Sequence, residues 1–157
     1  MGAAFFLVGC SPEYNWRELS VADGRAMVAF PARVQTESRP LKIDQHTLQF
    51  SLTSAAVKQN LFAVGYAPLP PELSQDQQTA IKNALLKSLA ANLGATLPDS
   101  AHDSEPFVLE SLSARPIRMV ARVLIHRGYV IQFVATGPPG ELNTTITEEF
   151  MRSISLR

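Results

Sequence analysis

The most regular hydrophobic pattern of the chain lies in its last quarter. Residues 117–126 and 129–135 fit a period of two, in which successive side chains of a β-strand point to opposite faces of the sheet. Arg127 and Gly128 separate the two stretches, and a glycine there permits the positive φ of a tight turn. The pattern predicts a β-hairpin, followed by an amphipathic helix over residues 143–154.

Both faces of this hairpin are largely apolar. In the first strand, one face carries Met119, Ala121, Val123 and Ile125. The opposite face carries Arg118, Val120, Arg122, Leu124 and His126. A sheet with apolar side chains on both faces must be covered on both sides, so we expect helices or a second sheet to pack against each face.

The stretch after residue 71 carries the strongest helix signals. Ser74 and Gln77 have the spacing of a capping box, in which each side chain bonds the backbone N–H of the other residue. Apolar residues then follow at steps of four, at Ile81, Leu85, Leu89 and Leu93. Gly94 is typical of the residue that ends a helix, so a helix is predicted over residues 75–93.

The remaining elements are expected to be strands. They are predicted over residues 16–21, 25–30, 34–43, 47–55, 61–67 and 107–112. The stretch 34–43 is polar and contains Pro40, which is typical of an irregular or edge strand. Strands and helices do not alternate, so the sequence favours an α+β domain in which an antiparallel β-sheet is flanked by helices.

Composition fits one globular domain. The chain has 157 residues, of which 46% are hydrophobic and 18% charged, enough to build a sizeable core. Fourteen Lys and Arg balance fourteen Asp and Glu. No run of basic residues appears, so we expect no nucleic-acid partner.

The first ten residues resemble the end of a bacterial lipoprotein signal peptide. Leu7, Val8 and Gly9 precede Cys10, the only cysteine in the chain. A small residue before the cysteine gives a membrane peptidase access to the bond, and the thiol can be capped as a thioether with diacylglycerol. Each buried CH₂ adds about 0.8 kcal/mol of membrane affinity, so several acyl chains would anchor the protein. The alternative is that Cys10 is a buried thiol at the end of a strand.

This resemblance implies a division of the chain and a location. Residues 1–9 are expected to be the signal peptide, 10–15 a tether after lipid attachment at Cys10, and 16–157 the domain. Signal peptides begin with Lys or Arg, and none precedes Cys10, so we expect the start of translation to lie further upstream. Ser11 is not the Asp that retains such lipoproteins at the inner membrane. The expected location is therefore the cell envelope, on the periplasmic face, at the outer membrane.

The domain itself resembles the Mog/PsbP-like superfamily. Four stretches carry the resemblance: Trp16-Arg-Glu before Asp23-Gly24, Val28-Ala-Phe30-Pro31, Phe62-Ala-Val-Gly-Tyr66, and Gly128-Tyr129 through Phe150-Met-Arg-Ser153-Ile154. Bacterial relatives often carry a Gly-Arg-Glu-like segment where this chain has residues 114–118. The resemblance implies an α/β/α sandwich and a binding or accessory role, as in members associated with photosystem assembly or with a small GTPase.

Candidate chemistry is sparse. His46, His102 and His126 are scattered and lack the short spacing of metal ligands, so no metal or other cofactor is expected. No Gly-x-Ser-x-Gly elbow and no phosphate-binding glycine loop occurs, so no catalytic residue is assigned. Asn143 begins a formal glycosylation triplet, but we interpret it as a helix N-cap.

Two proline-rich loops are the remaining candidates. Each lies between a strand end and a helix start, and a rigid loop loses little entropy on binding. The candidate docking residues are Pro68, Leu69, Pro70, Pro71, Pro138 and Pro139. The alternative is that these prolines only end strands.

Together these features predict a lipid-anchored envelope protein with a periplasmic binding or accessory domain and an unknown protein partner. The alternatives are a small envelope hydrolase or ligand-processing enzyme, and a structural envelope lipoprotein. A deep polar pocket with titratable groups in contact would favour the enzyme, and a partly apolar surface would favour the binder.

Overall fold

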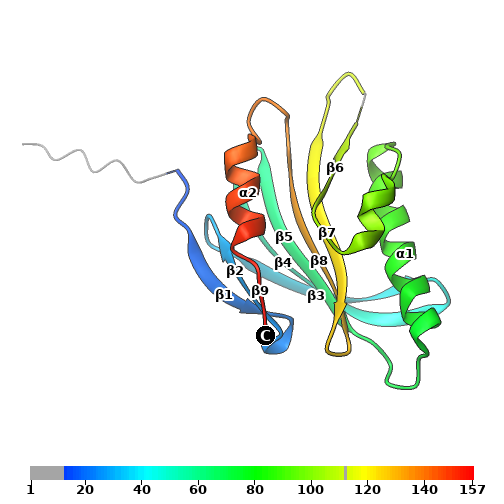
Figure 1. Ribbon diagram of the computed structural model, residues 1–157. Helices are drawn as coiled ribbons and strands as arrows, with labels where there is room; N and C mark the ends of the chain where they lie inside the picture. The colour runs from blue at the N-terminus through cyan, green and yellow to red at the C-terminus, as the bar shows by residue number, and fades with distance from the viewer. Residues whose placement is uncertain (1–12, 112) are drawn as a thin grey trace, which may run out of the picture.

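The computed structural model describes residues 13–111 and 113–157, and these form two antiparallel sheets and two helices (Figure 1). The larger sheet has the order β3-β4-β5-β8-β7-β6, and the smaller one has the order β1-β2-β9. This arrangement confirms the predicted α+β class, with an antiparallel sheet flanked by helices. The arrangement differs from the expected α/β/α sandwich on one face of the large sheet, where both a helix and the small sheet pack.

The bounds of the elements follow the sequence patterns closely. The large sheet consists of β3 (Gln35–Ile43), β4 (His46–Val57), β5 (Asn60–Pro68), β8 (Tyr129–Gly137), β7 (Arg118–His126) and β6 (Phe107–Glu110). The small sheet consists of β1 (Arg17–Val21), β2 (Ala26–Phe30) and β9 (Ser155–Leu156). The helices are α1 (Gln75–Leu93) and α2 (Thr144–Arg152), and short 3-10 turns span Ala22–Gly24 and Asp99–Asp103.

The hairpin predicted in the last quarter of the chain is β7–β8. Its register runs from Arg118 opposite Gly137 to His126 opposite Tyr129. Alternate residues enter two separate cores: Ala121 packs with α1, and Leu124 packs with the small sheet and α2. The expectation of cover on both faces is therefore confirmed.

Helix α1 matches its sequence signals. Ser74 Oγ accepts a hydrogen bond from the N–H of Gln77, and Gln77 Oε1 accepts one from the N–H of Ser74. Gly94 ends the helix in the left-handed conformation, with φ 64°. Leu85 and Leu89 are 6% and 8% exposed, so the predicted buried face is confirmed.

Some elements differ from the sequence prediction. β3 is an edge strand, one of the two predicted possibilities, and it is regular: it pairs with β4 along its whole length, with Pro40 opposite Gln49. β1 and β2 lie outside the large sheet, and β2 pairs with β9. This two-residue strand is too short to show an alternation pattern in the sequence. Residues 99–103, for which the sequence predicted no strand or helix, form a 3-10 turn.

The expected tether also differs where the structure describes it. The ring of Tyr14 stacks on Trp16, with centroids 6.0 Å apart, and Asn60 Nδ2 donates a hydrogen bond of 3.0 Å to the Tyr14 hydroxyl. Glu13 pairs with Lys58 at 3.0 Å. Residues 13–15 therefore contact the domain, and any free tether is confined to earlier residues, which lie outside the described part with Cys10.

A cluster of aromatic rings joins the small sheet and α2 to the large sheet. Phe150 of α2 contacts Phe30 of β2 and Phe62 of β5, with centroid distances of 6.1 and 5.4 Å. Ser153 Oγ accepts a hydrogen bond of 2.9 Å from the N–H of Ala29, which fixes the chain after α2. As Figure 1 shows, α1 lies on the other side of the large sheet.

Candidate functional site

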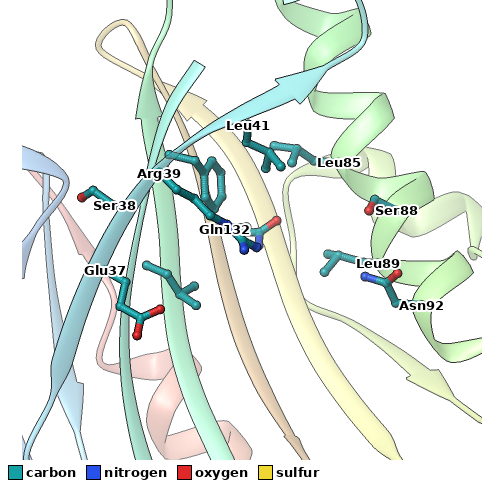
Figure 2. A pocket seen from close by; sticks show the side chains of 11 residues that line it. Glu37, Ser38, Arg39, Leu41, Leu85, Ser88, Leu89, Asn92 and Gln132 are labelled. Carbon is teal, nitrogen blue, oxygen red and sulfur yellow. The ribbon is translucent and has the colours of Figure 1, made fainter. Parts of the chain in front are cut away.

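A groove of about 730 Å³ lies between α1 and the large sheet. We call it the α1 groove. Its lining residues come from β3, β4, α1 and β8: Glu37, Ser38, Arg39, Leu41, Phe50, Leu52, Leu85, Ser88, Leu89, Asn92 and Gln132. Figure 2 shows that α1 and β3 form its two walls, with Leu41 and Leu85 approaching each other at one end.

The walls follow from the periodicity of their elements. Glu37, Arg39 and Leu41 alternate along β3 and point to the α1 side, opposite Leu52, Phe50 and Leu48 of β4. On α1, the buried Leu85 and Leu89 contribute apolar surface, while the exposed Ser88 and Asn92 border the opening. One wall is thus charged and the other is apolar with a polar rim.

The floor contains a glycine that brings an aromatic ring close to the sheet. Gly65 of β5 lies between Leu52 of β4 and Gln132 of β8. A Cβ at this position would lie 2.7 Å from Cε1 and Cζ of Phe50 and 3.1 Å from Cγ of Gln132. The absence of a side chain at Gly65 therefore lets the Phe50 ring lie flat against β5 and keeps the groove deep.

Gln132 is the one polar floor residue, and its carbonyl oxygen is unsatisfied. Oε1 is buried, and no described residue donates a hydrogen bond to it. An unsatisfied buried acceptor costs about 1–3 kcal/mol, which a ligand donor would recover. Sequence analysis did not single out Gln132. Its place on one face of β8 between Val130 and Val134 is the sequence signal that could have marked the floor.

The groove has two charges, which come from the same strand. Glu37 and Arg39 are both exposed, and neither belongs to an ion pair with another described residue. Figure 2 shows Arg39 directed across the groove toward Gln132, whereas the Glu37 side chain points away from Gln132. The arrangement can bind opposite charges at two places on β3, with apolar surface and a hydrogen-bond acceptor in the same groove.

The two proline-rich loops do not form one surface. Pro68 pairs with Tyr129 at the start of β8, and the N–H of Leu69 donates to the carbonyl of Gly128. Pro138 follows Gly137 at the other end of the same strand. Nine residues of β8 separate the loops, about 27 Å at the rise of a strand. Leu69 is 7% exposed and belongs to the core, so it is not available for docking.

The prolines lie at the ends of β5 and β8. Pro70 and Pro138 are half-buried, and Pro71 and Pro139 are exposed at their separate ends of the sheet. Neither loop borders the α1 groove.

The three histidines lie in separate parts of the fold. His46 closes the β3–β4 turn opposite Ile43. The ring of His102 bonds Asn83 Oδ1 at 3.1 Å, and that of His126 bonds the carbonyl oxygen of Arg157 at 2.8 Å. Over residues 13–111 and 113–157, no group of three His, Cys, Asp or Glu side chains is placed to hold a metal ion.

Asn143 has the role that its sequence context indicated. Its Oδ1 accepts a hydrogen bond of 3.0 Å from the N–H of Ile146, so it is the N-cap of α2.

Three titratable groups are perturbed by their surroundings, all outside the groove. The hydrogen bond that Lys58 donates to the Glu13 carboxylate raises the pKa of Lys58. Burial lowers the pKa of Lys82, whose Nζ donates to the carbonyl of His102 and to Ser104 Oγ. The pKa of Tyr129 is raised, chiefly by the short hydrogen bond that its hydroxyl donates to the Asp23 carboxylate. The contacts of Lys82 and Tyr129 hold turns against the core, so the two shifts follow from structural contacts.

A smaller hollow of about 320 Å³ lies between α2 and the β6–β7 edge. Val108, 44% exposed, and the buried Val120 form its apolar part. Nε of Arg118 is buried there without a partner in the described chain. This hollow is less than half the size of the α1 groove.

Comparison with known proteins gives no relative. No protein-family model, curated protein or solved structure matches this chain. The resemblances to lipoproteins and to the Mog/PsbP-like superfamily therefore stay predictions. Neither helix of the described residues has the length and hydropathy that a membrane span requires.

Proposed function

We propose that this protein is a ligand-binding protein of the cell envelope, held to the membrane by lipid on Cys10, and that it binds its ligand in the α1 groove. The observation that carries the binding role is the buried, unsatisfied Oε1 of Gln132 in the floor of a 730 Å³ groove. A cleft of this size that combines apolar side chains with convergent polar groups is suited to a small ligand with both apolar and polar parts.

The composition of the groove favours a binder over a hydrolase. Glu37 and Arg39 are its only charged lining residues, and neither histidine nor lysine is among the residues that line it with Ser38 and Ser88. A serine nucleophile needs a base within hydrogen-bond reach, so this site offers no means to activate one. The same groove argues against a purely structural role, because its unsatisfied acceptor costs stability unless a ligand occupies it.

Binding in the α1 groove is tested with an amphiphilic dye. The full chain is titrated with 1-anilinonaphthalene-8-sulfonate, whose rings fit the apolar wall and whose sulfonate suits Arg39. Ser88→Trp places a large ring in the groove from an exposed helix position and should abolish most of the fluorescence increase. Lys87→Trp, at the neighbouring exposed position that does not line the groove, is the matched control and should bind as the wild type does. Equal dye binding by both variants would refute the site.

The lipid anchor is tested separately, by mass. Expression from an upstream start should give a protein that carries the mass of diacylglycerol and acyl chains on Cys10 and incorporates labelled fatty acid. Cys10→Ala removes the only sulfur nucleophile of the chain, so both lipid attachment and cleavage before residue 10 should fail. The uncleaved precursor can still adhere to membranes through its apolar segment, so membrane association alone does not decide. An unmodified Cys10 in the mature protein would contradict the anchor and the location.

A further inference from the structure

Resting on the proposed function, we infer that the ligand of the α1 groove is a short peptide with free ends. Its ammonium group pairs with Glu37, its carboxylate pairs with Arg39, a backbone N–H donates to Gln132 Oε1, and its side chains lie on the apolar wall.

The spacing of the two charges fits such a ligand. Glu37 and Arg39 are two residues apart on one face of β3, which places their Cβ atoms about 7 Å apart. An extended dipeptide or tripeptide holds its terminal charges about 7–10 Å apart. Flexible Glu and Arg side chains that point in different directions cover this range (Figure 2).

The floor of the groove matches a peptide backbone. A peptide that spans Glu37 and Arg39 presents N–H groups along its length, and Gln132 Oε1 is a buried acceptor without a described donor. A fatty acid would satisfy Arg39 and the apolar wall, but it has no N–H for Gln132 and no cation for Glu37. The charge pattern of the groove therefore selects the zwitterionic peptide.

The apolar wall accounts for side-chain preference. Leu85 and Leu89 of α1 line the side of the groove that faces the charged strand, and Phe50 of β4 lies in its floor; all three are buried. Burying one aliphatic side chain there is worth about 1.5–3 kcal/mol, so peptides with Leu or Val should bind better than those with Gly.

The proposal is tested with blocked peptides. Calorimetry on the full chain compares trileucine with its N-acetylated, C-amidated and doubly blocked forms. Each block removes one terminal charge, and we expect each to weaken binding about 3- to 10-fold, since a partly exposed charged pair contributes about 1 kcal/mol.

Matched variants assign each end of the peptide to its residue. In Glu37→Gln, acetylation of trileucine should have no further effect, and in Arg39→Gln, amidation should have none. Arg17→Gln, which removes an exposed charge from β1 in the small sheet, is the control and should keep both effects at wild-type size. The Tm of each variant is measured alongside, because exposed substitutions of this kind should leave it unchanged.

The possible results separate this proposal from the binding function itself. Binding of trileucine that blocking does not weaken, or that survives Ser88→Trp, overturns the peptide assignment. If the dye occupies the groove and trileucine does not bind, the groove is a binding site for another ligand and the peptide proposal fails. If neither binds, both proposals fail.

Discussion

Gly65 links the packing of the large sheet to the shape of the α1 groove, so Gly65→Ala is the most informative single substitution. The added Cβ would lie 2.7 Å from two ring carbons of Phe50. Ordinary contacts between carbon atoms are about 3.5–4.0 Å, so the ring must move by about 1 Å. Phe50 is only 8% exposed and lines the groove, so we expect its ring to move into the open space of the groove.

Two effects on stability oppose each other in Gly65→Ala. Overpacking a close-packed site costs about 1–3 kcal/mol. Replacing glycine inside a strand restores about 0.5–1 kcal/mol, because glycine loses more backbone entropy on folding. The packing term is larger, so the free energy of unfolding should fall by about 0.5–2 kcal/mol. For a domain of this size, Tm should fall by about 1–8 °C.

Thermal unfolding and dye binding measure the two consequences of this substitution. The Phe50 ring, displaced toward the groove, should weaken the binding of the anilinonaphthalene dye as well as lower Tm. Gly140→Ala is the control, since a Cβ at Gly140 meets nothing within 4 Å, and it should leave both quantities nearly unchanged.

A double variant gives the decisive comparison. Phe50→Leu removes the ring atoms that the new Cβ would meet, so its combination with Gly65→Ala should cost about 1 kcal/mol less than the sum of the single substitutions. If Gly65→Ala behaves like Gly140→Ala in both assays, the ring does not rest on Gly65 and the description of the floor is wrong.

Three further substitutions test the fold by denaturant unfolding. Leu85→Ala should lower the free energy of unfolding by about 2–5 kcal/mol, and a loss below 1 kcal/mol would contradict the packing of α1. Ser74→Ala removes the capping box and should cost about 1 kcal/mol; Ser74→Asp, which keeps a capping oxygen, should cost less. Tyr129→Phe should cost about 1 kcal/mol at pH 7 by losing the bond to Asp23. Because that bond raises the pKa of Tyr129, the wild type should lose this advantage as the pH rises above about 10, whereas Tyr66→Phe should leave the alkaline loss intact.

The sequence predicted elements that are determined by their own residues. The capping box of Ser74 and Gln77, the apolar steps of α1 and the left-handed Gly94 act within one helix, so the bounds 75–93 were confirmed. The β7–β8 hairpin was equally local, because a two-residue turn fixes its register.

The groove could not be predicted in the same way, because it depends on contacts between distant segments. Its walls come from β3 and α1, and its depth depends on Gly65 and Phe50, which pack across neighbouring strands. Gln132 was visible in the sequence as a polar residue among apolar ones, but only the fold shows that its oxygen has no described donor. The separation of the proline-rich loops likewise follows from sheet topology.

The pairing of β2 with β9 has a consequence for the order in which the chain folds. Ala26 pairs with Leu156, about 130 residues later, whereas the β4–β5 and β7–β8 hairpins close turns of only a few residues. Closing so long a loop costs about 3 kcal/mol more than closing a short one, so it has to wait until other contacts have shortened it. The hairpins, β1–β2 among them, can form while the chain is still being made, but β9 cannot join β2 until residue 156 has emerged. A chain in transit through a ribosome or a membrane channel would therefore leave Phe30 without its contact to Phe150 until α2 and β9 arrive.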